Sequence, residues 1–347
     1  MKVKKARAAI LTQSRAPLIV DEIEFPEDLG VGQVLVKVLH TSICGAQLNE
    51  IGAVKGPDKF LPHLLGHVAS GIVVETGLGV TNIKAGDTVV LHWRPSLGIQ
   101  SPPAAYRWRG QKLNAGWVTT FNEFAVISEN RLTVIPPDTD LKIAPLFGCA
   151  VTTAAGVITN DAKVKLGESV VVFGVGGVGL PVVQFASLAG ANPVIAVDVL
   201  DSKLAMARAR GATHTIEAKQ GVDVAAEVRK IVGPRGPDKV IETTGAKSVI
   251  ELAYDLTNAD GTCVLVGVPS EKVTIYTLPI HFNKVLTGSH GGDAAPHIDI
   301  PRILRLVQAG RISFDGIITH EFSLDAINDA LDLVRSGTAG RVLLNVG

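Results

Sequence analysis

The sequence has few aromatic residues, no net charge and no long apolar run. Phe, Trp and Tyr make up 5% of its 347 residues, and 33 Lys and Arg are balanced by 33 Asp and Glu. Without an excess of basic residues there is no overall field to attract nucleic acid. No apolar run reaches membrane-spanning length, and the basic N-terminus lacks the apolar stretch of a signal peptide. We therefore expect a cytoplasmic protein with neither nucleic acid nor membrane as a partner.

Cysteine is also scarce. Cys44, Cys149 and Cys263 are odd in number and widely spaced, which does not fit a disulfide framework and indicates free thiols in a reducing compartment. Glycine, by contrast, is abundant, with 36 residues, and 46% of the chain is hydrophobic. Such a composition is typical of an α/β protein with tight turns, and the length suits two domains.

The chain changes pattern near Ala162. Before it, short segments rich in β-branched residues and separated by Gly, Pro and Asp predict a β-rich domain. After it, strands expected at 168–173, 193–198, 214–217, 239–242 and 263–266 alternate with helical stretches at 179–190, 202–210, 222–232 and 246–256. This alternation predicts a doubly wound parallel sheet of the Rossmann type. From residue 291 a helix, a strand, a second helix and a closing strand (341–345) are expected to return to the first domain.

A glycine-rich turn joins the first of these later strands to its helix. The segment 174–179, GVGGVG, fits G-x-G-x-x-G, and Asp198 ends the next strand about 20 residues later. Glycines there allow the backbone to approach a pyrophosphate at a helix N-terminus, and the acidic residue accepts hydrogen bonds from a ribose. A carboxylate at that place favours NAD over NADP. The cofactor-binding residues predicted from this motif are Gly174, Gly176, Gly177, Val178, Gly179, Asp198 and Lys203.

Two thiols and an imidazole form a candidate metal set. Cys44 lies in TSICG, His67 in LLGHVASG and Cys149 in LFGCAVTT. Two thiolates and one imidazole are ordinary zinc ligands, and three protein ligands leave a fourth position open. Their separation in the chain does not distinguish a metal site from three unrelated residues, each of which alone is more simply explained by packing.

Several stretches resemble the zinc-containing medium-chain alcohol dehydrogenases over nearly the whole chain. They include TSICG, LLGHVASGIVVETG, GCAVTTAAG, KVKLGESVVVFGVGGVG and LVGVP. The resemblance implies a GroES-like catalytic domain (1–155 and 291–347) and a Rossmann dinucleotide-binding domain (156–290). It also implies NAD-linked hydride transfer with a small alcohol, aldehyde or ketone, one catalytic zinc on Cys44, His67 and Cys149, and a homodimer or homotetramer.

The resemblance implies roles for further residues. Thr153, Val268 and Arg341 match contacts to the nicotinamide, its carboxamide and the pyrophosphate, and Thr244 is also expected to bind the cofactor. Ala46 and Trp93 match positions at the substrate pocket, although core packing explains Trp93 equally well.

The chain departs from the family after its first cysteine. Ala46 replaces the hydroxyl residue that in the family touches the substrate oxygen. Gln47 replaces an aspartate that orients the histidine ligand, and Asn49 replaces a relay histidine. Val68 replaces the glutamate that usually follows the histidine ligand. Glu50, or else His40, is a candidate for another proton path.

Segment 94–117, where many relatives hold a second, structural zinc, contains no cysteine, so no thiolate zinc site is expected there. We expect a solvated loop or a subunit contact; a further hypothesis is that its Arg107 and Arg109 attract an anionic substrate group.

Two other functions stay open at this level. A zinc-free reductase of the same superfamily, of the enone or quinone type, would retain Cys44, His67 and Cys149 as relics. A non-catalytic dinucleotide-binding protein would explain the changed polar residues around them.

Overall fold

The computed structural model describes all residues from Met1 to Gly347 and divides into two compact units. Unit 1 comprises Met1–Cys149 and Ala295–Gly347, and unit 2 comprises Ala150–Ala294. The boundaries expected from the sequence, at 155/156 and 290/291, both fall inside unit 2. No helix in either unit is long and apolar enough to cross a bilayer.

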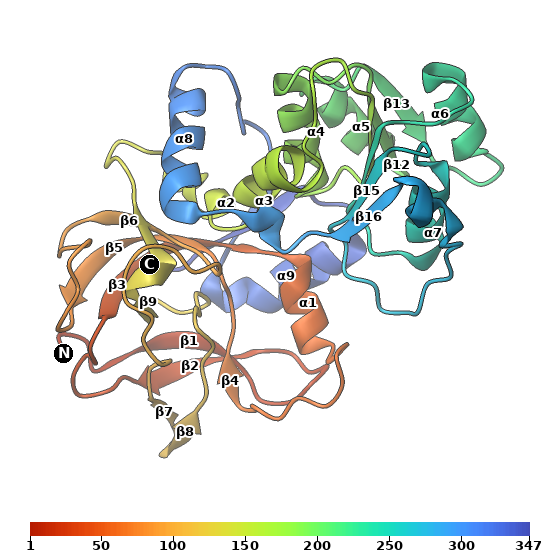
Figure 1. Cartoon of the computed structure of the whole chain (residues 1–347). Coiled ribbons are helices and arrows are strands. Elements are labelled where there is room, and N and C mark those ends of the chain that lie inside the picture. Colours follow the sequence, from red (N-terminus) through yellow and green to blue (C-terminus); the bar gives the residue numbers. More distant parts are fainter. The chain divides into compact units, whose positions relative to one another are not determined.

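Unit 1 is built mainly of antiparallel strands (Figure 1). Its strands are β1 (Lys5–Leu11), β2 (Ile19–Glu24), β3 (Gln33–Ile43), β4 (His63–Leu64), β5 (Ala69–Thr76), β6 (Thr88–Leu91), β7 (Tyr106–Trp108), β8 (Gln111–Leu113), β9 (Phe124–Ser128), β10 (Leu132–Val134), β17 (Ile318–Ser323) and β18 (Arg341–Asn345). Its helices are α1 (Gly45–Ile51), α2 (Ala144–Phe147), α8 (Pro296–Gln308) and α9 (Ile327–Ser336), with 3₁₀ turns η1 (Glu129–Arg131) and η5 (Leu324–Ala326).

These strands form two sheets. One has the order β4-β1-β2-β7-β8, and the other runs β10-β6-β5-β3-β18-β17 with β9 also paired to β3. The period-two pattern of β3 explains why it serves two cores: Val34, Val36 and Val38 belong to one hydrophobic cluster and Leu35 to another, all fully buried. The returning tail contributes β18, which pairs antiparallel with β3.

Part of the segment expected to be a solvated loop or a subunit contact is folded into the first sheet. Its strands β7 and β8 form a hairpin, β7 extends the sheet next to β2, and Tyr106 is buried, with its hydroxyl accepting a hydrogen bond from Val126 N–H. Arg109 lies over the Trp108 ring and pairs with Asp21 at 2.8 Å. Asp21 is thus the partner of Arg109, while Arg107 donates to the carbonyl of Gly110, so the anion-attracting role of the two arginines stays a prediction.

Unit 2 alternates strands and helices. Its strands are β11 (Val170–Phe173), β12 (Val194–Asp198), β13 (His214–Glu217), β14 (Lys239–Glu242), β15 (Thr262–Leu265) and β16 (Val285–Gly288). Its helices are α3 (Ala150–Gly156), the π-helix η2 (Val157–Asp161), α4 (Gly179–Leu188), α5 (Asp201–Arg208), α6 (Val224–Val232) and α7 (Lys247–Leu256), with 3₁₀ turns η3 (Leu278–Phe282) and η4 (Gly291–Asp293).

The six strands of unit 2 are parallel and follow the order β13-β12-β11-β14-β15-β16. From β11 the chain adds β12 and β13 toward one edge of the sheet. It then returns to the other side of β11 and adds β14, β15 and β16 toward the opposite edge. Right-handed crossovers therefore place α4 and α5 on one face and α7 on the opposite face. This order confirms the predicted Rossmann-type α/β fold and creates a switch point between β11 and β14, outside whose carboxyl ends such sheets bind ligands.

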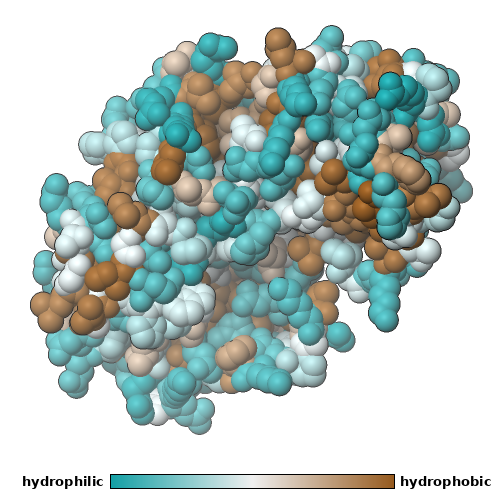
Figure 2. Space-filling model, viewed as in Figure 1, coloured by the Kyte–Doolittle hydropathy of each residue, from teal (hydrophilic) through white to brown (hydrophobic).

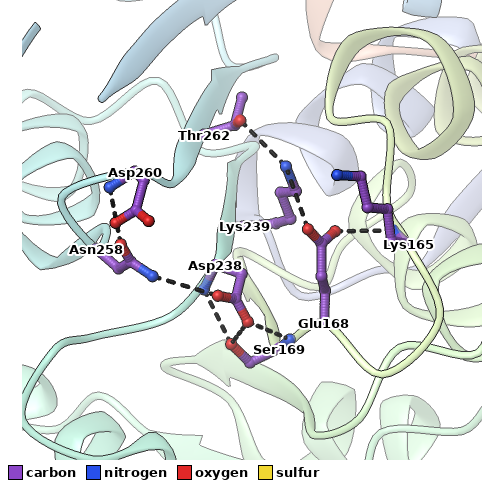
Figure 3. Close-up of polar contacts among 8 residues, drawn as sticks. All are labelled: Lys165, Glu168, Ser169, Asp238, Lys239, Asn258, Asp260 and Thr262. Carbon is purple, nitrogen blue, oxygen red and sulfur yellow. Dashed lines mark hydrogen bonds and ion pairs between the residues drawn. The ribbon is translucent and has the colours of Figure 1, made fainter. Parts of the chain in front are cut away.

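The amino-terminal ends of these strands are joined by a polar cluster (Figure 3). Asp238, just before β14, accepts hydrogen bonds from the N–H and hydroxyl of Ser169 at 2.9 and 2.7 Å, and from Asn258. Lys239 donates to the Thr262 hydroxyl at 3.2 Å. The cluster thus links the segments that begin β11, β14 and β15, at the end of the sheet opposite the switch point.

Candidate metal centre and cofactor loop

Three side chains that are distant in the sequence converge in unit 1. Cys44 precedes α1 at the end of β3, His67 lies between β4 and β5, and Cys149 follows α2. Their sulfur and ring nitrogen atoms all lie within 4.8 Å of one another. All three side chains are half-buried, so the group they form is enclosed yet reachable.

Backbone packing fixes the position of His67. The preceding Gly66 adopts φ +94°, and a Cβ there would lie 2.3 Å from the Thr120 hydroxyl oxygen, so only glycine fits. The carbonyl of Leu65 accepts hydrogen bonds from the N–H groups of Thr120 and Phe121. On the other side, the Thr41 hydroxyl donates to the carbonyl of Val68 at 2.7 Å. The backbone is therefore fixed on both sides of His67.

The surroundings of the two thiols favour ionisation of only one of them at a time. A hydrogen bond from Cys149 holds the pKa of the Cys44 thiol well below its usual range, against the effect of burial and with help from His67 and the Arg341 charge. The neighbouring Cys44 sulfur and burial raise the pKa of Cys149. The second proton therefore leaves readily only when a cation shares the site.

Two further side chains contact this group. The buried amide of Gln47 accepts a hydrogen bond from the Cys44 N–H at 2.9 Å through Oε1, and its Nε2 contacts His67 Nδ1. Trp93 donates a hydrogen bond to Cys149, and this bond acts to lower the pKa of the thiol. The donor is the indole N–H, the only donor of a tryptophan side chain. Trp93 therefore lies beside the thiols.

The donor set fits zinc. Two sulfurs and one imidazole at mutual distances below 4.8 Å match a three-ligand zinc site that leaves one position free. A thiol that ionises easily meets the requirement that zinc binds thiolate rather than thiol.

Helix α1 carries the other residues predicted near this group. Ala46 and Glu50 are exposed on it. The protein packed around Glu50 raises the pKa of its carboxyl, while the nearby His63 and His67 rings oppose the rise. His63 is itself buried and pairs with Asp58 at 2.8 Å. The other candidate for a proton path, His40, is bonded through Nδ1 to Asn345.

In unit 2 the glycine motif forms the turn between β11 and α4 at the switch point. A Cβ on Gly179 would lie 1.9 Å from the carbonyl oxygen of Gly174, so the turn closes on itself as the motif requires. A Cβ on Gly174 would in turn meet the Thr244 side chain at 2.6 Å. Thr244 therefore lies against the turn, while the intervening Gly176, Gly177 and Val178 are half-buried.

Asp198 lies at the carboxyl end of β12. One carboxylate oxygen accepts the N–H of Val175 at 2.8 Å and the other accepts the N–H of Leu200 at 3.1 Å. Lys203 is half-buried on α5, which begins three residues after Asp198. The predicted ribose-binding carboxylate is thus joined to the glycine turn.

The remaining predicted cofactor residues lie in different surroundings. Val268 is exposed, Thr153 is buried in α3, and Arg341 is buried at the start of β18, where its guanidinium donates to the carbonyl of Ile43. The charge of Arg341 favours thiolate at both Cys44 and Cys149. The sequence reading did not anticipate this, because nothing in the sequence places residue 341 beside residue 44.

A second residue that the sequence reading missed is Glu242. It is fully buried at the carboxyl end of β14, and it accepts hydrogen bonds from the backbone N–H groups of Thr244 and Gly245. Burial raises the pKa of this carboxyl. An acidic residue closing an apolar parallel strand at the switch point was the available signal.

Comparisons with known proteins agree with this geometry. Residues 30–137 match the model of the alcohol dehydrogenase GroES-like domain, and residues 177–309 match that of the zinc-binding dehydrogenase. An S-(hydroxymethyl)glutathione dehydrogenase from Escherichia coli O1:K1 is 31% identical over 368 aligned residues, covering 98% of this chain and 99% of the relative.

Two solved structures extend the similarity to the fold. The alcohol dehydrogenase zinc-binding domain protein from Burkholderia ambifaria superposes with a TM-score of 0.90 at 29% identity, covering 99% of both chains. Benzyl alcohol dehydrogenase from Acinetobacter calcoaceticus has a TM-score of 0.88 at 25% identity, covering 99% of this chain and all of its own.

Proposed function

Because the chain belongs to the zinc-containing medium-chain dehydrogenase/reductase superfamily, and is thus an oxidoreductase of the alcohol dehydrogenase type, we propose that it transfers a hydride between NAD(H) and a small alcohol or its carbonyl. The convergence of Cys44, His67 and Cys149 is the observation that carries this proposal. A zinc ion held there supplies a Lewis acid for the substrate oxygen.

The chain's own residues give the site its electrostatics. Cys44 is the thiol poised to ionise, and Arg341 favours thiolate at both cysteines. Trp93 donates to Cys149, which supports our proposal that it lines the substrate pocket. If both thiols ionise, the two negative charges would be balanced by a dication.

We assign proton transfer to Glu50. Ala46 has no proton to exchange and Asn49 does not titrate, so the usual family path is interrupted. Glu50 is exposed to solvent, is influenced by the His67 ring, and has a raised pKa that brings it nearer to neutral pH. These properties suit a group that carries a proton from the site to water.

NAD is the proposed cofactor. The glycine turn and the N-terminus of α4 supply the pyrophosphate site, with Thr244 against the turn. Asp198 presents a fixed carboxylate at the end of β12, which accepts ribose hydroxyls and repels a 2′-phosphate. Thr153, Lys203 and Val268 are proposed as further contacts on family grounds alone.

We propose a single zinc per chain. The segment that holds a second zinc in many relatives has no thiol, and here it includes the β7–β8 hairpin. Cys263 is fully buried in β15 of unit 2, and burial raises the pKa of its thiol to about 12. Such a thiol is a core residue rather than a ligand.

We further propose a homodimer or homotetramer, with the edge strand β16 in a subunit contact. β16 has a partner strand only on its β15 side. Hydrophobic residues gather over the region of β16 and α7 (Figure 2), and Tyr276 and Phe282 are 70% and 66% exposed. An open strand edge beside such a patch needs a partner. Sedimentation velocity of the wild type and of Phe282→Asp tests this, and a monomeric wild type would refute it.

A panel of alcohols and carbonyls with NAD and NADP, run alongside metal analysis, tests the function. Because of the names of the relatives, the panel includes benzyl alcohol and S-(hydroxymethyl)glutathione. NAD-linked turnover that needs zinc is expected. Equal turnover of enones or quinones by metal-free protein would instead identify a zinc-free reductase. Binding of NADH without turnover of any compound would identify a non-catalytic protein.

A further inference from the structure

We propose that Gln47 is a positioning residue that favours the metal-free form of His67 and thereby makes the chain bind zinc more weakly than its ligand set allows. The inference rests on the zinc site proposed above. It concerns a single buried amide placed between two of the three ligands.

The two ends of this amide contact different ligand residues. Gln47 lies on α1 and is 2% exposed, so its polar atoms depend on protein partners. Its Oε1 accepts the N–H of Cys44 at 2.9 Å, and its Nε2 contacts Nδ1 of His67. With Nδ1 engaged by the amide, Nε2 is the ring nitrogen left for the metal.

A carboxamide offers one accepting oxygen and one donating NH2 group. The Cys44 N–H is a donor in every state of the protein. In the metal-free protein, His67 Nδ1 accepts from the NH2 group when the ring proton is on Nε2, and both ends of the amide are satisfied.

Metal binding through Nε2 changes His67 Nδ1 from a hydrogen-bond acceptor into a donor. An imidazole that binds metal through Nε2 carries its proton on Nδ1, and this N–H ordinarily donates to a carboxylate or carbonyl. Two donors, the Cys44 N–H and the His67 Nδ1–H, then flank an amide with only one oxygen. Turning the amide over transfers the mismatch from His67 to Cys44, because the NH2 group then faces the Cys44 N–H. A buried donor left without an acceptor is costly.

Another buried glutamine shows the matched arrangement. The Gln33 oxygen accepts the N–H of Gly30 at 2.8 Å, and its NH2 donates to the carbonyl of Pro102 at 3.1 Å. There one donor and one acceptor flank the amide, whereas two donors would flank Gln47 once His67 holds a metal.

The test is the zinc affinity of the full chain in Gln47→Glu, measured by competition with a chelator at fixed pH. A glutamate has the same length, and its two oxygens accept from both donors. We expect zinc to bind about 10–100-fold more tightly, the usual size of an effect from a ligand's hydrogen-bond partner. Gln111→Glu, which adds the same charge at an exposed position of β8, should leave the affinity unchanged. Equal or weaker binding by a Gln47→Glu protein with wild-type circular dichroism would overturn the inference.

A second measurement needs no altered Gln47. In metal-free wild-type protein with ¹⁵N-labelled histidine, long-range ¹H–¹⁵N spectra at mildly alkaline pH report the tautomer of His67, assigned with His67→Asn. We expect the proton on Nε2, and a proton on Nδ1 would overturn the inference. If the wild type bound no zinc at all, the proposed function would fail, while this spectrum would still decide the role of Gln47.

Discussion

The Asp198 carboxylate accepts a 2.8 Å hydrogen bond from the backbone N–H of Val175, so the end of β12 is joined to the glycine turn after β11. The two strands are parallel neighbours, and their paired residues include Phe173 and Val197. The carboxylate proposed to select the cofactor is therefore also part of the turn that receives the pyrophosphate.

Replacing Asp198 by Asn should lower the preference for NAD. The negative charge that repels a 2′-phosphate is lost, and an amide cannot accept from both Val175 and Leu200. Hydrogen bonds to charged groups contribute about 1.5–3 kcal/mol, so the ratio of kcat/KM with NAD to that with NADP should fall about tenfold or more. Glu217→Gln at the end of β13 should leave the ratio unchanged. An unaltered ratio in Asp198→Asn would remove this residue from cofactor selection.

Loss of either proposed cysteine ligand should abolish metal binding. Cys44→Ser and Cys149→Ser each remove one of three thiolate or imidazole donors, and the expected zinc content after dialysis is close to zero, with turnover lost. Cys263→Ala, which alters a buried thiol of unit 2, should keep both zinc and turnover. Zinc retained in both ligand variants would show that the metal lies elsewhere.

Replacing Glu50 by Gln should change the pH profile of alcohol oxidation. Because the pKa of Glu50 is raised, its carboxylate forms at a higher pH than that of an ordinary glutamate, and the rate should rise with pH through that value. The Gln variant cannot accept a proton, so this limb should disappear, and kcat should fall about 10²–10⁴-fold. Glu27→Gln, at an exposed position, is the control. An unchanged limb in Glu50→Gln would assign the proton to another group.

Asp238→Asn should destabilise unit 2 at neutral pH. Burial raises the pKa of Asp238, but the stronger combined effect of the Ser169 hydrogen bonds and the Lys239 charge lowers it. A lowered folded pKa means that this carboxylate stabilises the fold above about pH 4, the unfolded value, and that the contribution is lost as pH falls through the folded pKa.

The free energy of unfolding of Asp238→Asn should therefore fall by about 1–3 kcal/mol at pH 7, and the difference from wild type should shrink in acid. Thermal unfolding at pH 7 and pH 3 measures it. Asp260→Asn removes an exposed carboxylate paired with Arg235, and it should change the midpoint little. A pH-independent difference would show that the Asp238 charge is not what stabilises the cluster.

The sequence predicted the parallel sheet well because its strands are short apolar runs ended by glycine or charge. The ranges expected for β13 and β14 in this sheet, and for β18 in unit 1, coincide with those in the structure. Strand β16 was missed because it has only four residues, one of them a glycine, and lies at an edge, where few contacts demand an apolar pattern.

The candidate site was predicted in its residues but not in its contacts. The resemblance named Cys44 and His67, yet the amide that contacts both belongs to a short helix without a strong capping residue, which the pattern did not reveal. The proximity of Arg341 to the thiols depends on the tail returning to pair with β3. Such relations follow from tertiary pairing, which no local window of sequence records.

The most direct test of the account is zinc content and alcohol-dependent NADH formation measured in one preparation, before chelation, after chelation and after zinc is restored. We predict close to one zinc per chain, loss of turnover together with the metal, and recovery of both. Full turnover in the chelated protein, with Cys44, His67 and Cys149 free of metal, would contradict it.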